Sequence, residues 1–482
     1  MPNSVNSIIW FRNDLRVADN TALNAAALNA TSEQGALIAL FVITRGQWQK
    51  HHMGLAKQDF ILRNLKSLQA DLHKLNIPLL IRGCSYFSEV PDVVAEVAKQ
   101  HRIKTIYWNK EYLLNEIKRD RLAAAKLETM GIKSIACHDS LLIPPGQVLT
   151  GQGEMYKVFT PFYRNWLEKT KAFIPSLTSA PKIQAPLSID SDEIPSLPQE
   201  TDFNADEITS LWPTGKGVIE NRLKDFAEEL IKEYPTNRDI PLLNATSQLS
   251  PYLSVGALSA RQCLAVAQNL SDAQSKEGTT AWIRQLAWRD FYNHLILAYP
   301  KLVKGQPFIK ATTNIRWSED TEAFTAWAQG KTGQPFVDAG MRQLRQTGWM
   351  HNRLRMITAM FLTKNLFIDW HWGETHFLEH LVDGDFALNN SGWQWSASTG
   401  TDAAPYFRVF NPFSQSKRFD PEGIFIKRYV PELNNLPTQA LHDPNLLEKL
   451  RPASYPKLLV DIKQSRSKAI SVFSEILNSQ AR

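Results

Sequence analysis

The sequence predicts an α/β N-terminal domain, built on a five-stranded parallel Rossmann-like sheet, and an all-helical C-terminal domain. Two observations lead to this fold class. Short apolar runs alternate with helical patterns over the first 140 residues, whereas only helical periodicity remains from about residue 217 onward. We therefore expect domains over 1–140 and 217–482, joined by a connector over 141–216. A chain of 482 residues is long enough for a large core in each domain.

The predicted strands are short apolar runs that lack the alternation of a half-exposed strand. Repeated strand–helix units place such strands in parallel, with helices on both faces of the sheet. The five strands are expected at Ser7–Phe11, Ala36–Ile43, Ile77–Ile81, Lys104–Trp108 and Lys133–Cys137. Between them, apolar residues at helical spacing predict helices over Asp59–Leu75 and Val90–His101.

The second domain has helical periodicity throughout and is rich in tryptophan. Its helices are expected at Val218–Tyr234, Ser254–Asn269, Gly278–Ala298, Thr321–Gln329, Phe336–Gln346, Asn352–Asn365 and Thr375–Leu381. Nine of the 14 tryptophans lie between residues 282 and 395. So many flat aromatic side chains indicate that this domain stacks on a planar ligand.

The expected connector is acidic and rich in proline. Residues 172–212 hold seven acidic side chains against the single Lys182, and five prolines lie within 175–198. This composition predicts an irregular segment. Its charge is −6, and because the whole chain carries +6, the remainder carries +12. Basic domains of this kind indicate a polyanionic partner.

The composition excludes several protein classes. With 43% hydrophobic and 21% charged residues, the chain is neither disordered nor of membrane type, and no apolar run approaches the roughly 18 residues of a membrane helix. The start, Met1–Ser4, lacks a signal segment, so we expect a cytoplasmic protein. Cys84, Cys137 and Cys263 form no CxxC pair, which argues against a zinc ribbon or a disulfide scaffold.

Common catalytic and binding motifs are missing or incomplete. No GxGxxG follows the first strand, no GxSxG is present, and Gly330–Thr332 lacks the earlier glycine of a phosphate loop, where Thr325 stands. The run His376–His380 fits HxxEH, which places two imidazoles on one helical face. Because no third ligand is obvious, we interpret it as a polar helix end with solvated histidines and expect no metal.

Four segments of the second domain concentrate polar and aromatic groups. They are Thr246–Pro251, Trp282–Tyr292, Gly348–Met356 and Asp383–Trp395. Hydroxyls ahead of a helix suit a phosphate, and a tryptophan, an amide and a cation on one helical face could read a base edge and a phosphate. Each pattern also fits a bland alternative: an N-cap, a core tryptophan, a solvated basic face or a surface loop.

Together these segments resemble the photolyase/cryptochrome flavoproteins, specifically the bacterial class I cyclobutane pyrimidine dimer photolyases. The resemblance runs from Trp10–Arg16 to Phe407–Pro412, and the run from Asp383 to Pro412 is its most specific part. It implies an antenna domain, a helical domain that binds FAD and DNA, and a deoxyribodipyrimidine photo-lyase, a carbon–carbon lyase. Excited reduced FAD would pass an electron to a flipped-out cyclobutane pyrimidine dimer, which then splits.

The resemblance also implies a flavin site in the helical domain. Arg355 would pair with Asp383, Asp385 would meet the imide edge of the flavin, and Asn389 would lie at its reactive ring nitrogen. The residues implied to line FAD are Tyr234, Thr246, Ser247, Gln248, Leu249, Ser250, Trp282, Trp349, Arg355, Asp383, Gly384, Asp385 and Asn389. The tryptophan relay from flavin to surface matches Trp393, Trp370 and Trp317.

A DNA-binding surface follows from the same resemblance. Trp288 and Trp395 would form an apolar wall against the dimer, while Gln285, Asn352 and Met356 would contact it. Several bacterial members carry Glu where this chain has Gln285, so the amide keeps a hydrogen bond but loses the charge. The other implied DNA contacts are Arg238, Arg289, Tyr292, Arg353, Arg408 and Gln415.

The antenna cofactor is expected to be methenyltetrahydrofolate. His51, Asn115, Glu116 and Lys304 match positions that hold a folate in folate-type members, although each also fits an ordinary surface residue. A deazaflavin or an empty antenna site stays open at this stage.

Three other functions compete with dimer repair. A cryptochrome-type blue-light sensor without repair activity is the main alternative, and a dark flavin oxidoreductase would turn over without light. The (6-4) photolyases carry a histidine pair in the stretch where Asn352 and Met356 stand, which favours cyclobutane dimers here. We expect a monomer in the cytoplasm, associated with the nucleoid and not with a membrane.

Overall fold

The computed structural model describes residues 5–172, 176–197, 205–270 and 274–478. Tertiary contacts divide the chain into two compact units. The first comprises Met1–Phe203, Trp212–Lys232 and Ser247–Pro300, and the second comprises Asn204–Leu211, Glu233–Thr246 and Lys301–Arg482. The domain boundaries expected near 140 and 216 stay a prediction. Of the expected acidic connector, 176–197 has neither helix nor strand, and 173–175 and 198–204 lie outside the described residues.

The first unit contains a five-stranded parallel sheet, as the sequence predicted. Its strands are β1 (Val5–Phe11), β2 (Ala36–Thr44), β3 (Leu79–Cys84), β4 (Thr105–Asn109) and β5 (Lys133–Cys137). The strand order is β3-β2-β1-β4-β5, with all neighbours parallel. This is the doubly wound arrangement. The prediction started β3 at Ile77, two residues too early, because Pro78 has no N–H to donate to the ladder.

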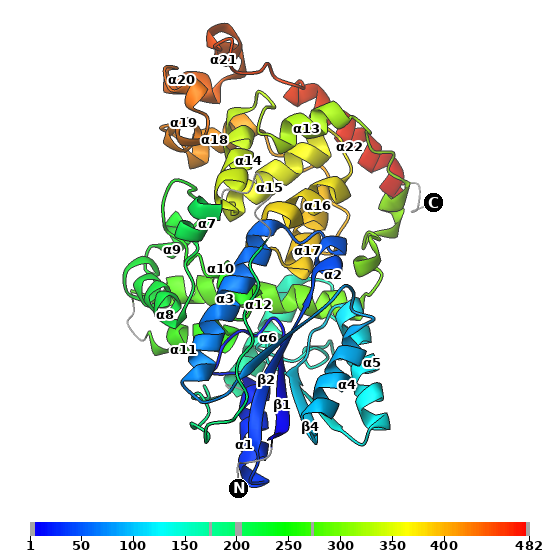
Figure 1. The fold of residues 1–482 in the computed structure, drawn as a ribbon. Coiled ribbons are helices and arrows are strands. Elements are labelled where there is room, and N and C mark those ends of the chain that lie inside the picture. The colour runs from blue at the N-terminus through cyan, green and yellow to red at the C-terminus, as the bar shows by residue number, and fades with distance from the viewer. Residues whose placement is uncertain (1–4, 173–175, 198–204, 271–273, 479–482) are drawn as a thin grey trace. The chain divides into compact units, whose positions relative to one another are not determined.

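Helices cover both faces of this sheet, as Figure 1 shows for α4 and α5 on one side and α1 and α3 on the other. Ile8, Trp10, Ile38 and Leu40 pack in one buried cluster with residues of α4 and α5. The helical segments of the unit are α1 (Thr21–Ser32), α2 (Arg45–Lys50), α3 (Leu55–His73), α4 (Val90–Gln100), α5 (Leu114–Thr129), α6 (Phe159–Ala172), α8 (Lys216–Asp225), the π-helical η1 (Phe226–Leu230), α10 (Ser250–Ser254), α11 (Ala260–Asn269) and α12 (Lys276–Ala298).

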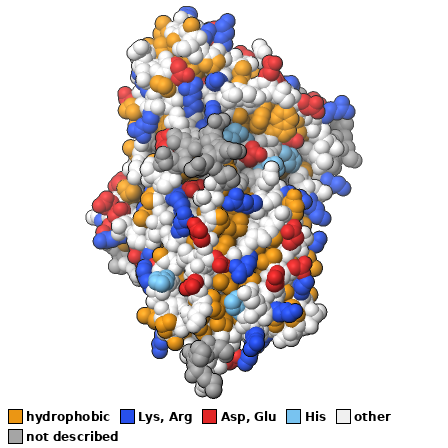
Figure 2. Space-filling view, viewed as in Figure 1, with side chains coloured by type: hydrophobic (Ala, Val, Ile, Leu, Met, Phe, Trp, Pro, Cys, Tyr) orange, Lys and Arg blue, Asp and Glu red, His pale blue; other side chains and the backbone are white. Residues whose placement is uncertain are grey.

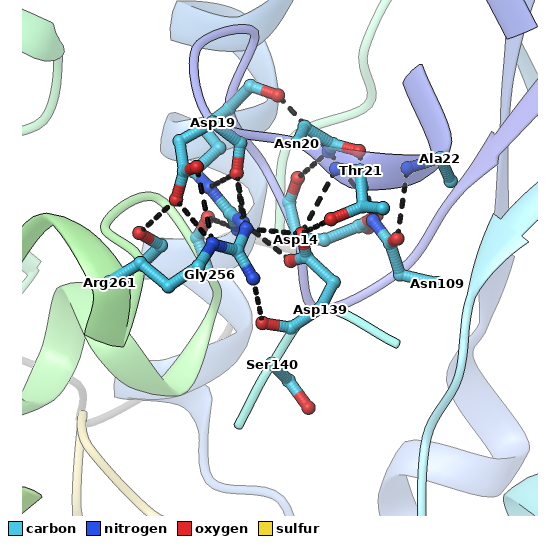
Figure 3. Close-up of polar contacts among 12 residues, drawn as sticks. Asp14, Asp19, Asn20, Thr21, Ala22, Asn109, Asp139, Ser140, Gly256 and Arg261 are labelled. Carbon is cyan, nitrogen blue, oxygen red and sulfur yellow. Dashed lines mark hydrogen bonds and ion pairs between the residues drawn. The ribbon is translucent and has the colours of Figure 1, made fainter. Parts of the chain in front are cut away.

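A buried charge cluster ties the carboxyl end of the sheet to α11 (Figure 3). The Arg261 guanidinium donates to the Asp139 carboxylate at 2.6 Å and to the Asp19 carboxylate at 3.0 Å. Arg16 pairs with the same Asp139 and donates to the backbone oxygen of Gly256 at 3.0 Å. All four charged side chains are at most 8% exposed. Two cations and two anions therefore balance one another inside the first unit.

In the second unit, every helix or strand assigned within the described residues is a helix, which confirms the predicted helical C-terminal region. Its segments are α7 (Ala205–Leu211), α9 (Tyr234–Asn237), η2 (Leu302–Lys304), η3 (Lys310–Asn314), α13 (Thr321–Ala328), α14 (Pro335–Thr347), α15 (Asn352–Met360), the π-helical η4 (Phe361–Asn365), α16 (Trp370–His380), α17 (Phe386–Ala397), α18 (Pro412–Phe419), α19 (Ile424–Tyr429), η5 (Pro431–Leu433), α20 (Thr438–His442), α21 (Pro444–Leu450) and α22 (Ile462–Asn478).

Several predicted helices were wrong in extent. The helices expected from Asp59 and Thr375 begin earlier, at Leu55 and Trp370. The helix expected from Ser254 breaks after that residue, because Gly256 adopts a left-handed conformation with φ of 66°. Ser259 then starts α11 with a capping box to Gln262. The helix expected to reach Tyr234 becomes π-helical after Asp225 and ends before that tyrosine.

The hydropathy of the helices and the distribution of surface charge can be compared with the composition. Among the described residues, no helix combines the length and the apolar character needed to cross a bilayer. Figure 2 shows Lys and Arg side chains interspersed with Asp and Glu over the face in view, so basic charge is not gathered into one field on that face.

Replacing Arg261 by Met should lower the free energy of unfolding by about 3–5 kcal/mol, because it leaves Asp19 and Asp139 buried with one cation fewer. Denaturant unfolding of the purified chain measures this change. Lys74→Met is the matched control, because Lys74 pairs with Asp71 while 72% exposed, and its loss should change stability by less than about 1 kcal/mol. Equal effects of the two substitutions would contradict a stabilising role for the buried cluster.

Candidate functional site

An ion pair joins α15 to the turn before α17. One Arg355 nitrogen lies 2.9 Å and 3.1 Å from the two Asp383 carboxylate oxygens, and Arg355 Nε donates to the Met350 carbonyl at 2.8 Å. Asp383 is 4% exposed and Arg355 is 26% exposed. The pair implied by the resemblance is therefore present, and it leaves a guanidinium edge accessible beside a buried carboxylate.

The first turn of α17 presents two further polar side chains. Asp385 caps the helix by accepting from the backbone N–H of Leu388 at 3.1 Å. Asn389, one turn later, donates from Nδ2 to the Glu374 carbonyl at 2.9 Å. This bond fixes the amide plane and directs the amide oxygen, an acceptor, elsewhere. The second unit thus groups Arg355, Asp383, Asp385 and Asn389 on α15 and α17, which contact each other.

This donor set fits reduced FAD. A flavin offers an imide N–H, ring carbonyls and, when reduced, an additional ring N–H. Half-buried Asp385 can accept from an imide, the accessible edge of Arg355 can donate to a carbonyl or stabilise negative charge, and the fixed amide oxygen of Asn389 can accept from a ring N–H. The other implied flavin residues of this unit are buried Tyr234 and Gly384 and half-buried Thr246 and Trp349.

The first unit holds the remaining implied flavin residues. Trp282 is 4% exposed and packs against Phe226, with ring centroids 4.9 Å apart. Gln248 adopts a left-handed φ of 49°, unusual for a residue other than glycine, and accepts from Arg222 at 3.2 Å. Ser247 is half-buried, Leu249 is buried, and Ser250 is exposed at the first position of α10. A strained loop just before a helix is compatible with a binding segment.

The three implied relay tryptophans differ in burial within the second unit. Trp393 and Trp370 are each 2% exposed, whereas Trp317 is half-buried. The backbone N–H of Ser318 donates to the Phe367 carbonyl at 2.8 Å, so the segment that carries Trp317 lies beside the start of α16, where Trp370 is the first residue.

The side chains of α12 that are implied to meet DNA lie in the first unit. Trp288 is half-buried and stacks on Phe159, with ring centroids 3.6 Å apart and an interplanar angle of 6°. Arg289 donates to the Ser140 carbonyl at 2.6 Å, so one of its nitrogens already serves the fold. Gln285 and Tyr292 are half-buried. Sequence reasoning missed Phe159, because the residue is remote in the chain and carries no motif.

The implied DNA contacts of the second unit divide by accessibility. Asn352 is exposed and lies 3.9 Å from the half-buried Met356 sulfur. Arg353, expected to face solvent or phosphate, instead pairs with Asp239 at 2.7 Å and lies over Phe419. Of the remaining residues of this set, Arg408 is exposed, and the half-buried ones are Arg238, Trp395 and Gln415.

Three of the four implied antenna residues meet in the first unit. Gln47 and Asn115 each place an amide nitrogen within 3.0 Å of His51 Nε2, which makes Nε2 the acceptor and leaves the proton on Nδ1. His51 Nδ1 lies 3.9 Å from Glu116. Burial, together with the neighbouring Glu111 carboxylate, raises the pKa of Glu116 to about 7. Lys304, the fourth residue, is exposed in the second unit.

Comparisons with known proteins agree with this geometry. The family model described as DNA photolyase matches residues 7–184, and the model for the FAD binding domain of DNA photolyase matches residues 282–475. The sheet from residue 7 onward and the helices that carry Arg355 and Asn389 fall within these matched segments, whereas Tyr234 and the loop over 246–250 lie between them.

Individual relatives cover nearly the whole chain. The deoxyribodipyrimidine photo-lyase of Vibrio cholerae is 43% identical over 97% of this chain and 98% of that protein. A bacterial class III photolyase from Agrobacterium tumefaciens is 31% identical, with a TM-score of 0.89 over 99% of both chains. A Synechocystis cryptochrome is 28% identical, with a TM-score of 0.84 over 98% of this chain and 100% of that one. The chain therefore belongs to the DNA photolyase family.

Proposed function

We propose that this chain repairs cyclobutane pyrimidine dimers in DNA in a light-driven reaction that uses reduced FAD. The observation that carries the proposal is the group formed by Arg355, Asp383, Asp385 and Asn389, because its acceptors and its cation match the polar edge of a reduced flavin. Bound reduced FAD, once excited, supplies one electron to the dimer and receives it back. The protein consequently needs no general base or nucleophile, in agreement with the missing motifs.

The residues around the flavin bind and orient it. Arg355, held by Asp383 and by the Met350 carbonyl, offers positive charge that stabilises the anionic reduced form. Asp385 would accept from the imide edge, and because Asn389 Nδ2 is anchored on the Glu374 carbonyl, the amide oxygen would accept from a ring N–H. Light-driven transfer requires a rigid donor, and this set is fixed by hydrogen bonds within one unit.

DNA would be bound through aromatic and basic side chains. Trp288 is already stacked on one face by Phe159, so it forms a rigid platform for an extruded pyrimidine. Exposed Asn352 offers an amide to a base edge, and exposed Arg408 offers charge to phosphate. Because phosphate contacts of this kind carry affinity without reading sequence, binding should weaken steeply with salt and depend little on sequence.

The antenna is proposed to be methenyltetrahydrofolate, bound at the His51–Asn115–Glu116 cluster. Glu116 and the amide of Asn115 can pair with the amino and ring N–H groups of a pterin. The raised pKa of Glu116 favours its protonated form when no pterin is bound, and pairing with those donors would favour the carboxylate.

A blue-light sensor without repair activity is the alternative within the family. The Vibrio cholerae relative, at 43% identity, carries the photo-lyase name, whereas the cryptochrome is 28% identical. This difference favours the enzyme.

A single-dimer oligonucleotide tests the proposed function. With the flavin reduced, blue light should restore the two thymines, seen as recovery of thymine absorbance and confirmed by chromatography. A dark reaction and a (6-4) photoproduct oligonucleotide are the controls, and neither should be repaired. If an FAD-loaded, reduced sample leaves the dimer intact under light, the sensor alternative holds.

We also propose that Trp393, Trp370 and Trp317 reduce oxidised flavin by electron relay. The relay depends on a close approach between α16 and α17. A Cβ on Gly373 would overlap the Trp393 ring, so only glycine lets the indole lie against α16. Phe377 and Trp327 close the other sides, with ring centroids 4.9 Å and 6.0 Å from Trp393. The first relay ring is thus locked in a dry, rigid site.

Gly373→Ala should therefore displace Trp393. The overpacking should lower the free energy of unfolding by about 1–3 kcal/mol, and flavin photoreduction should slow. Gly392→Ala on α17 is the matched control, because its Cβ would meet nothing within 4 Å. That substitution should raise stability by about 0.5–1 kcal/mol and leave photoreduction unchanged. Equal behaviour of both variants would mean that the Trp393 position is not set by Gly373.

The middle relay ring carries a titratable neighbour. His371 stacks on Trp370 with ring centroids 3.7 Å apart. Its Nδ1 lies 2.7 Å from an Asp369 oxygen, and its Nε2 lies 2.8 Å from the Gly305 carbonyl oxygen. Burial opposes the imidazolium, but these two acceptors raise the pKa of His371 above its ordinary value, with the Glu374 charge assisting. The cation is therefore the form present at lower pH.

Photoreduction should accelerate as the pH rises from about 6 to about 9, because loss of the His371 proton removes a cation from beside Trp370. A positive charge this close to Trp370 raises the energy of the oxidised, cationic indole by about 4 kcal/mol near a protein surface. Loss of the charge should therefore change the photoreduction rate by about tenfold or more. In His371→Arg, photoreduction should stay slow across this pH range. In His371→Gln, it should stay fast across the same range. Initial photoreduction rates in blue light with a thiol donor measure this dependence.

Trp393→Phe provides the control for the relay itself, since it should lose photoreduction at every pH while chemically reduced enzyme still repairs DNA. A wild-type rate that stays flat with pH would rule out the role of His371. Undiminished photoreduction in Trp393→Phe would rule out the relay.

A further inference from the structure

The last turn of α16 gathers three metal-ligating side chains that have no part in the proposed flavin site. One ligand atom from each of His376, Glu379 and His380 lies within 4.8 Å of the other two. The sequence analysis interpreted this run as solvated histidines because a third ligand was missing. The structure assigns that place to Glu379, which the helix brings to the same face as both histidines.

We propose that His376, Glu379 and His380 bind one divalent transition-metal ion of the Zn²⁺ class. Two imidazole nitrogens and one carboxylate oxygen are a donor set that zinc favours, with a fourth position left for water. The imidazole rings of His376 and His380 are adjacent, with centroids 4.1 Å apart. Glu379 is exposed and belongs to the same helical turn as the two histidines.

The two histidines are held in the ligating form. His380 Nδ1 lies 2.8 Å from the His376 carbonyl oxygen, which can only accept, so Nδ1 carries the proton and Nε2 carries the lone pair. His376 is 9% exposed, and its Nε2 has no hydrogen-bond partner among the described residues. A buried polar atom without a partner is costly unless a ligand satisfies it.

The surroundings of this cluster are aromatic and carry one opposing charge. Phe324 and Trp327 of α13 pack against His376, with centroid distances of 6.1 Å and 5.5 Å. These rings fix the orientation of His376. Exposed Arg345 on α14 places a positive charge near both His376 and His380, and this charge opposes the binding of a metal ion. Removing that charge should therefore strengthen metal binding.

Calorimetric titration of the metal-stripped, full-length chain with Zn²⁺ alone tests the proposal. One equivalent should bind, and thermal unfolding should shift upward with Zn²⁺ concentration. Loss of a residue that only orients a metal ligand weakens binding by about 10–100-fold. Glu379→Gln and His380→Gln each remove a ligand itself, so each should raise the Kd by at least this much. Arg345→Gln should lower the Kd about threefold, a gain that misfolding cannot imitate.

His73→Gln is the matched control, since this histidine is exposed in the last turn of α3 and has no place in the proposed site. Its Kd should equal that of the wild type, and circular dichroism should show that all variants are folded. Failure of the wild type to bind one equivalent, or equal binding by Glu379→Gln and His380→Gln, would overturn the proposal. So would a loss in His73→Gln as large as theirs, because Zn²⁺ would then bind adventitiously to surface histidines.

Discussion

The buried charges of Asp19, Asp139, Arg16 and Arg261 are the constraint on which the first unit depends. Asp139 follows β5 directly, and Arg261 lies on α11, more than 120 residues later in the chain. Although burial disfavours a carboxylate, the two guanidiniums hold the pKa of Asp139 well below its usual range. Their geometry permits only one docking of α11, and α12 with Trp282 follows directly. Trp282, which is proposed to line the flavin, thus lies on a helix whose neighbour is held by contacts remote from this tryptophan.

This cluster also explains what the opening motif of the family resemblance does. Arg16 closes the buried charge cluster, and Asp14 accepts from the Arg12 backbone N–H at 2.7 Å and from Asn109 at 2.6 Å. Arg12 in turn lies over the Trp10 ring. Apart from Arg12 Nε, which has no hydrogen-bond partner among the described residues, these polar groups are paired inside the first unit. The motif is therefore a structural clamp, and its distinctive sequence reflects exact pairing of buried charges and not chemistry on a substrate.

The sheet could be predicted because parallel strands buried on both faces leave continuous apolar runs. The Arg355–Asp383 pair was reached through the family resemblance, and the structure bears it out. Other features left no local trace. The partner of Arg353 is Asp239, whose position depends on the tertiary fold. Likewise, the stacking of Trp288 on Phe159 needs the packing of α6 against α12, which no spacing in the sequence encodes.

One helix contact serves both parts of the proposed chemistry in the second unit. Glu374 on α16 accepts from Asn389 through its backbone oxygen and from Asn390 through its carboxylate, at 2.9 Å and 2.8 Å. Asn390 then accepts from Gln394, so three residues of α17 are fixed on one side chain and its backbone. One residue before Glu374, Gly373 lets Trp393 approach α16. The Asn389 amide, proposed to face the flavin, and the Trp393 ring, proposed to start the relay, are therefore positioned by the same interface. Asn389 and Trp393 lie about one turn apart on α17, so a displacement of this helix relative to α16 would move both side chains together.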